Sequence, residues 1–147
     1  MNRFLAATPL LLLAAASDSL PIQPGKWQTT ITTLDVQMPS GPPGVVAALR
    51  GKPPQVVTAC VTPQQAAAGP RGVVEASKGA CRYTSFTASG GRLNGAMACK
   101  FGTGTMTATS TGRYTATTLD INGTSVMTGR MRMTMKTHTV SRRLGPC

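Results

Sequence analysis

Three methionines at alternate positions, Met131, Met133 and Met135, are the residues whose type and spacing point most directly to a chemical role. Thioethers are soft ligands that suit Cu(I), so this Met-x-Met-x-Met segment is a candidate copper-binding segment. A strand would place the three side chains on one face about 7 Å apart, which is too far for one ion without ligands from neighbouring strands. Further ligands could come from three other methionines, Met97, Met106 and Met127.

The other interpretation of these methionines is that they fill an irregular core. Flexible thioether side chains do this well, and packing requires no metal. Alternating apolar residues in a strand need only burial on one side. We therefore expect packing and no cofactor, and we keep soft-metal binding as the alternative function.

The first sixteen residues have the features of a secretory signal peptide. Arg3 supplies positive charge, an apolar run follows from Phe4 to Ala16, and small alanines precede Ser17. This combination is typical of export signals, and the apolar run is too short to span a membrane as a mature helix. The sequence thus predicts a signal peptide at 1–16 and a single exported domain at 17–147, which is not integral to the membrane once processed.

Export would place the four cysteines where disulfides can form. An even number of cysteines in an oxidising compartment predicts two disulfides, for which three connectivities are possible. Cys81 and Cys99 are symmetric about Gly90, so a hairpin that turns there would set them directly opposite each other, within bonding reach. This pairing leaves Cys60 with Cys147.

The chain has few residues that could form a catalytic site. His138 is the only histidine, and Asp35, Glu75 and Asp120 lie far apart in the sequence. There is no evident carboxylate pair and no nucleophile-elbow pattern near any serine. No Cys-x-x-Cys occurs, and the cysteine gaps do not resemble a zinc site. We expect a non-enzymatic protein without catalytic residues, in which His138 is a solvated surface imidazole.

The chain is strongly basic, with a formal net charge of +11. Removing Arg3 leaves fourteen Lys and Arg against four acids, or +10. Such an excess favours anionic partners. Nucleic acid is an unsuitable partner because aromatic residues are few and the chain carries an export signal. An anionic envelope component fits better, although the charge could equally serve solubility alone. The candidate basic patch consists of Arg82, Lys100, Arg130, Arg132 and Lys136.

The first half of the chain predicts two strands and one short helix. A threonine-rich strand is expected over 26–38, with a bulge where the apolar phase shifts between Ile31 and Leu34. The remaining expected elements are a proline-rich loop with at most one helical turn at 39–54, a strand at 55–61, a capped helix at 63–68 and an irregular segment at 71–79. Trp27 is expected to cap the core.

The second half predicts a meander of strands. A hairpin is expected over 80–88 and 92–101, with Met97 opposite Tyr83 and Leu93 opposite Thr87. A strand should follow at 105–111, and Asn122-Gly123 should turn a final hairpin over 112–121 and 124–140. The last strand would carry methionines 127, 131, 133 and 135 inward, and Arg130, Arg132, Thr134, Lys136 and His138 outward.

These elements predict a mainly β fold, an antiparallel meander that forms a small sandwich or barrel with one short helix and two disulfides. Its core of Met, Val, Leu and Ala would be small, so we expect the disulfides to supply part of the stability of the fold. If the sheet closes around the methionines, it could hold a small apolar ligand in a pocket lined by Met97, Met131 and Met133.

Four features occur in a recognisable order: Pro24-Gly25-Lys26-Trp27, Cys60-Val61-Thr62-Pro63, two mid-chain cysteines, and a Met/Thr strand that closes on Arg142-Arg143-Leu144-Gly145-Pro146-Cys147. In this set the chain resembles domain-of-unknown-function family 3617, small exported proteins of Gram-negative bacteria. The resemblance covers essentially the whole mature chain. It implies a periplasmic, mostly β domain with paired cysteines, and it implies no activity, substrate or catalytic residue.

Overall fold

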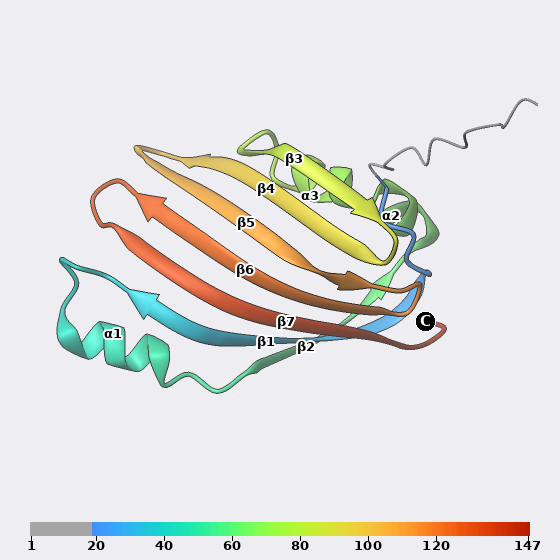
Figure 1. The fold of residues 1–147 in the computed structure, drawn as a ribbon, viewed down its shortest axis with the longest axis horizontal. Helices are drawn as coiled ribbons and strands as arrows, with labels where there is room; N and C mark the ends of the chain where they lie inside the picture. The colour runs from blue at the N-terminus through green and yellow to red at the C-terminus, as the bar shows by residue number, and fades with distance from the viewer. Residues whose placement is uncertain (1–18) are drawn as a thin grey trace, which may run out of the picture.

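A computed structural model describes residues 19–147, so the predicted signal peptide lies outside the described residues. Seven strands form one antiparallel sheet in the order β2-β1-β7-β6-β5-β4-β3 (Figure 1). The strands are β1 (Gly25–Gln37), β2 (Gln55–Val61), β3 (Cys81–Ser89), β4 (Arg92–Phe101), β5 (Gly104–Tyr114), β6 (Thr118–Thr128) and β7 (Met133–Gly145). The mainly β, antiparallel fold with two disulfides is confirmed. The predicted closure into a small sandwich or barrel is wrong. The sheet is single and open, because the edge strands β2 and β3 do not pair with each other.

Three short helices accompany the sheet where one was expected: α1 (Pro43–Arg50), α2 (Pro63–Ala68) and α3 (Pro70–Ala76). The predicted capping box of α2 is present. The Thr62 hydroxyl accepts from Gln65 N at 3.2 Å, and the Gln65 side chain accepts from Thr62 N at 2.9 Å. The expectation of an irregular segment at 71–79 is wrong for its first part. Proline suits the first position of a helix, so the Gly69-Pro70 pair that ends α2 also begins α3.

The proline-rich loop at 39–54 contains a helix of eight residues, α1, rather than a single turn. Arg50, at its end, fastens it to the sheet. The Arg50 guanidinium donates two hydrogen bonds to the Val36 carbonyl, at 3.0 and 2.7 Å, and lies 3.4 Å from the Asp35 carboxylate. These contacts hold the helix beside the end of β1.

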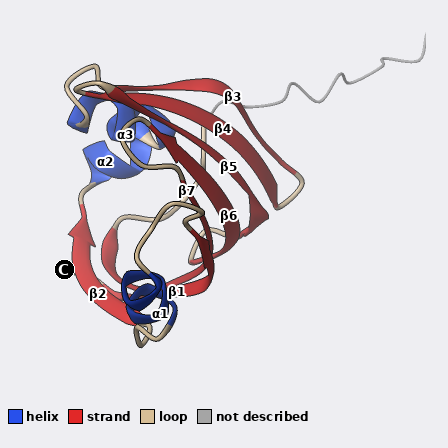
Figure 2. Cartoon of the chain, turned by 90° about the vertical axis from the view of Figure 1, so that its left-hand side faces the viewer, coloured by secondary structure: helices blue, strands red, loops and turns tan. Residues whose placement is uncertain are grey.

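The sheet is curled into an open trough (Figure 2). The chain between the two edge strands runs through α2 and α3, which occupy the gap where a closed barrel would pair β2 with β3. The convex face of the trough is exposed to solvent and rich in threonine. On β5, for example, Thr105, Thr107, Thr109 and Thr111 are all exposed. The buried apolar residues Val36, Ala88 and Leu93 lie on the concave face, which also carries Thr137 and Thr139.

The fully buried core is thin, as expected. Its apolar members among the described residues are Trp27, Val36, Ala66, Ala88, Leu93 and Cys99. Trp27 is 4% exposed and its indole N–H donates to the Gln23 carbonyl at 3.0 Å, which confirms its core-capping position. The expectation that methionines fill this core is wrong. Met133 and Met135 are only half-buried on the concave face, because no second layer of strands covers that face.

The predicted hairpin turn at Asn122-Gly123 is wrong, because β6 runs straight through both residues. Asn122 lies on the convex face between Thr111 and His138, and Gly123 lies on the concave face. A Cβ on Gly123 would approach the Thr137 hydroxyl to 3.0 Å, so close packing accounts for this glycine. The turn lies earlier, where the Thr115 hydroxyl accepts from the backbone N–H groups of residues 117 and 118.

This shift also changes the last hairpin. β6 ends at Thr128 and β7 begins at Met133, so residues 129–132 form the turn between them. The prediction that Met131, Arg130 and Arg132 belong to the final strand is therefore wrong. Met133 and Met135 do lie on the concave face, while Thr134, Lys136 and His138 lie on the convex face as expected.

The sheet has three register shifts, of which one lies between Lys26 and Trp27 at the start of β1. The expected bulge in β1 is present between Thr33 and Asp35, and the residue between them, Leu34, is 58% exposed. A second bulge, at Thr84 in β3, was not foreseen. The hairpin turns at Gly90-Gly91, both with positive φ, which pairs Leu93 with Ala88 rather than Thr87. The Thr84 bulge then restores Tyr83 opposite Met97 and Cys81 opposite Cys99, as predicted.

The two disulfides join Cys81 to Cys99 and Cys60 to Cys147, which confirms the predicted connectivity. The first encloses a separation of 18 residues and the second one of 87. Each fastens an edge strand of the open sheet. Cys81 belongs to β3, and Cys60 belongs to β2 and is joined across β1 to the chain terminus beyond β7.

Removal of either disulfide should lower the free energy of unfolding, and the longer loop should matter more. Loop-closure entropy predicts a loss of about 3 kcal/mol for Cys81→Ala/Cys99→Ala and about 4.6 kcal/mol for Cys60→Ala/Cys147→Ala. Urea unfolding of the two double variants and the oxidised parent measures both values. Equal unfolding midpoints for all three proteins would contradict the prediction.

Candidate ligand-binding site on the concave face

A cavity of about 850 Å³ lies between the concave face of the sheet and the helices α2 and α3. This volume falls in the range of roughly 300 to 1,000 Å³ that is usual for small-molecule sites. The sheet supplies Ala59, Cys60, Val61, Tyr83, Phe86, Leu93, Ser110 and Ile121, the helices and the glycine between them supply Gln64, Gln65, Ala68, Gly69, Pro70, Gly72, Glu75 and Ala76, and the N-terminal segment supplies Leu20 and Ile22. The lining is therefore mostly apolar.

Two aromatic rings form one wall of the cavity. Tyr83 and Phe86 are three residues apart, so strict alternation along β3 would put them on opposite faces of the sheet. The bulge at Thr84 changes the phase and turns both toward the concave face. Their ring centroids are 5.6 Å apart in an edge-to-face arrangement. Sequence reasoning missed this pair because the bulge shows only in the register of the folded hairpin.

Small residues pack closely beside the aromatic pair. Gly95 on β4, Ser110 on β5 and Gly123 on β6 are cross-strand neighbours on the concave face. A Cβ on Gly95 would come within 3.0 Å of the Ser110 hydroxyl and 3.4 Å of the Phe86 ring. A second hollow of about 240 Å³ lies over these residues and shares Tyr83, Ser110 and Ile121 with the larger cavity. The two hollows therefore adjoin each other on the concave face.

Charge is nearly absent from the cavity. Of its lining residues only Glu75 carries a carboxylate, and that residue is exposed on α3. Burial raises the pKa of the Tyr83 phenol above its usual value of 10.0, because desolvation disfavours the phenolate. Among residues 19–147 there is no group of three or more His, Cys, Asp or Glu side chains that could hold a metal ion. The site suits a neutral, apolar group.

Methionines gather at one end of the trough. Met106, Met127 and Met133 are direct cross-strand neighbours on β5, β6 and β7. A separate hollow of about 260 Å³ at this end is lined in part by Met38, Met127, Met131 and Met133. The predicted pocket lined by Met97, Met131 and Met133 is wrong. Met97 lines the second hollow, of about 240 Å³, and Met131 lies in the β6–β7 turn.

The predicted basic patch is not assembled on the sheet. Arg82 and Lys100 are diagonal neighbours on the convex face of β3 and β4, as expected, since Arg82 pairs with Ala98. Lys136 lies on the same face of β7, but β5 and β6 separate it from them. Arg130 and Arg132 are in the β6–β7 turn. The five residues therefore do not form one patch on the sheet. Arg82 and Lys136 lie on the convex face, and Lys100, on that face near the end of β4, is also at the same end of the molecule as Arg130 and Arg132.

His138 lies on the convex face, away from the cavity. Its Nε2 is 2.8 Å from Oδ1 of Asp120, on the neighbouring strand. The two residues are 18 positions apart, so the sequence alone did not suggest the pair. The histidine side chain is 36% exposed, which agrees with the expected surface imidazole.

A family model for proteins of unknown function, DUF3617, matches residues 22–147. The chain belongs to this family. The match includes every strand and helix of the described structure, and it confirms the resemblance seen in the order of the proline-glycine-lysine-tryptophan, cysteine and terminal motifs. No curated protein and no solved structure matches the chain.

The described part of this family member includes no helix that is long and apolar enough to cross a membrane.

Ionisation of Tyr83 should make the protein less stable at alkaline pH. Its folded-state pKa is raised, so the folded protein keeps a proton that the unfolded chain releases. The resulting stability is present below the unfolded pKa of about 10 and is lost as pH rises through the folded value. Urea unfolding across this range should show a shallower alkaline loss for Tyr83→Phe than for the parent. Identical pH slopes in both proteins would contradict the prediction.

Proposed function

We propose that this protein is an exported, non-enzymatic binding protein that holds an acyl chain of an anionic envelope amphiphile in its concave trough. One observation carries the proposal, the apolar cavity of about 850 Å³ between the sheet and α2–α3. A well-formed apolar concavity with few polar groups is the usual form of a site for apolar small molecules.

The shape of the trough favours a chain-like ligand. The larger cavity shares Tyr83, Ser110 and Ile121 with the second hollow of about 240 Å³, so the two hollows adjoin each other along the sheet. An acyl chain gains about 0.8 kcal/mol for each CH₂ removed from water, and it makes no demand on charged partners. In the larger cavity a polar substrate would find only Gln64, Gln65, Glu75, Ser110 and the Tyr83 phenol as polar side chains.

The acidic head group and the export are inferred from charge and cysteines. The chain carries a net charge of +11 and only four acidic residues, which favours anionic ligands by long-range attraction. Both disulfides join residues that would be reduced in a cytosol, so they support a periplasmic location.

Displacement of a fluorescent fatty-acid analogue by palmitic acid tests the proposal. The parent protein should bind the analogue, and Ser110→Phe should weaken binding at least tenfold because the new ring fills the trough. Thr107→Phe is the matched control, since Thr107 lies on the same strand but on the exposed convex face. Absence of binding by a folded parent protein, or equal losses in the two variants, would reject the proposal.

A second candidate function, Cu(I) binding, is favoured by one observation. Met106, Met127 and Met133 lie side by side on three strands, which brings together the partners from other strands that a soft ion needs. The ligand set differs from Met131, Met133 and Met135, because Met131 is outside β7.

Titration with Cu(I) against a competing chelator tests this candidate. If the three methionines hold the ion, Met127→Leu should weaken binding at least tenfold, because leucine keeps the apolar volume but removes the central sulfur. Met97→Leu, outside the trio, should leave the affinity unchanged. No Cu(I) binding at micromolar protein would end the copper proposal.

A further inference from the structure

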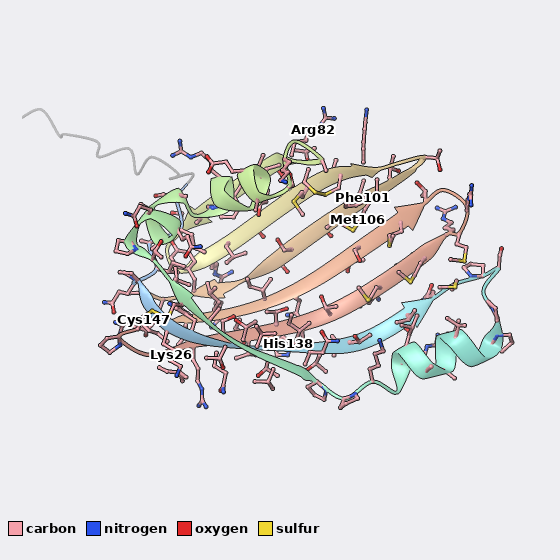
Figure 3. The ribbon with its side chains drawn as sticks, turned by 180° about the vertical axis from the view of Figure 1, so that it is seen from behind. Lys26, Arg82, Phe101, Met106, His138 and Cys147 are labelled. Atoms are coloured by element: carbon pink, nitrogen blue, oxygen red, sulfur yellow. A yellow bond between two sulfur atoms is a disulfide. The ribbon has the colours of Figure 1, made fainter. Side chains whose placement is uncertain are left out.

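One end of the trough exposes large apolar side chains. Phe101, at the end of β4, is 50% exposed, and Met131, in the β6–β7 turn, is 58% exposed. Met127, at the end of β6, is 37% exposed. Figure 3 shows Phe101 toward the end of the sheet that lies away from Cys147. We call the surface formed by segments 78–80, 100–103 and 128–132 the tip.

The three segments of the tip are neighbours in space. The Lys100 backbone N–H donates to the Ala80 carbonyl at 2.8 Å, which joins the start of β3 to the end of β4. A Cβ on Gly129 would lie 3.0 Å from the Cα of Gly104, so the β6–β7 turn abuts the β4–β5 turn. The apolar residues and the charges on these segments therefore belong to one surface.

The charge of the tip is entirely positive. Its segments contain Lys78, Lys100, Arg130 and Arg132, all exposed, and no acidic residue. Asp35, near the end of the adjoining β1, lies 3.4 Å from Arg50 and is thus already paired. The tip combines a phenylalanine and a methionine with four cations, and Met127 lies next to it at the end of β6.

We propose that the tip docks on an anionic phospholipid surface. Phe101 and Met131 enter the interfacial region, and the four cations lie against the lipid phosphates. Each Lys or Arg near an anionic surface adds about 1 kcal/mol of attraction, and apolar side chains at the interface add to it. This docking is separate from ligand binding in the cavity, because none of the four cations and neither Phe101 nor Met131 lines that cavity.

Charge complementarity selects a membrane over a second copy of the chain. A symmetric pairing through the tip would bring Lys78, Lys100, Arg130 and Arg132 of one copy against those of the other. Like charges in such an interface repel, whereas an anionic lipid surface neutralises them. The exposed apolar residues then meet a partner that carries the opposite charge.

Co-sedimentation of the purified, oxidised protein with vesicles tests the docking. Vesicles of equal parts phosphatidylglycerol and phosphatidylcholine should bind the protein at low salt, and pure phosphatidylcholine vesicles should not. Binding should weaken as salt is raised past about 0.1 M, where the Debye length is about 10 Å. Arg130→Gln and Arg132→Gln should each lower the partition coefficient roughly fivefold. Controls of equal charge change are the single variants Arg92→Gln and Arg113→Gln, at the other end of the sheet, which should each have a smaller effect.

The apolar contribution has its own variant and control. Phe101→Ser/Met131→Ser should lower the partition on the order of tenfold. Val56→Ser/Val57→Ser removes apolar side chains that are similarly exposed, 59% and 52%, from the edge strand β2, and should leave the partition unchanged. A Phe101→Trp probe should shift its emission to the blue on anionic vesicles, while the buried Trp27 contributes a constant background.

Several outcomes would overturn the inference. These are absence of binding to anionic vesicles at low salt, equal binding to neutral vesicles, and equal losses in the tip variants and their controls. A dimer in solution that Phe101→Ser/Met131→Ser dissociates, without vesicle binding, would assign the tip to self-association instead. Fatty-acid displacement, measured without vesicles, should be unchanged in the tip variants, so failure of the docking and failure of the cavity proposal are distinguishable.

Discussion

Both edges of an open, curled sheet are fastened covalently, and the rest of the structure depends on this constraint. Cys81–Cys99 joins the edge strand β3 to β4, and Cys60–Cys147 joins the edge strand β2 to the chain terminus beyond β7. An edge strand has hydrogen bonds on one side only and is the first part of a sheet to separate. With so few fully buried apolar residues, packing alone would hold these edges weakly, and the crosslinks compensate by restricting the unfolded chain.

Because the sheet is open and single, its concave face is not covered by further strands. A closed barrel of this size would fill its interior with side chains, and a sandwich would cover the face with a second sheet. Here two short helices bridge the gap between β2 and β3 (Figure 2). A cavity of about 850 Å³ lies between these helices and the sheet. Gly95, Ser110 and Gly123, on three neighbouring strands, place only small side chains on this part of the concave face. A ligand would therefore complete a core that the chain leaves incomplete.

Apolar and charged residues are separated by position as well as by face. On β5, period-two alternation sends Met106 and Ala108 to the concave face and threonines to the convex face, so the two sides of this strand differ in chemistry. The turns at one end escape this alternation, because residues outside strands are not bound to either face. Met131, Arg130 and Arg132 lie in such a turn, and they give that end both apolar and cationic character.

The sequence by itself determined the mainly β class, the two disulfides and their pairing, the capped helix α2, the bulge in β1 and the buried tryptophan. Each of these rests on local signals: alternation, a capping box, a glycine turn between two cysteines, or a shift in apolar phase. Only the tertiary structure decided that Asn122-Gly123 continues a strand, that Gly69-Pro70 starts α3, and that the Thr84 bulge brings Tyr83 and Phe86 to one cavity. The positions of a turn, of a second helix and of a bulge depend on the register and packing of strands that are distant in the sequence. These long-range interactions cannot be recognised from neighbouring residues alone.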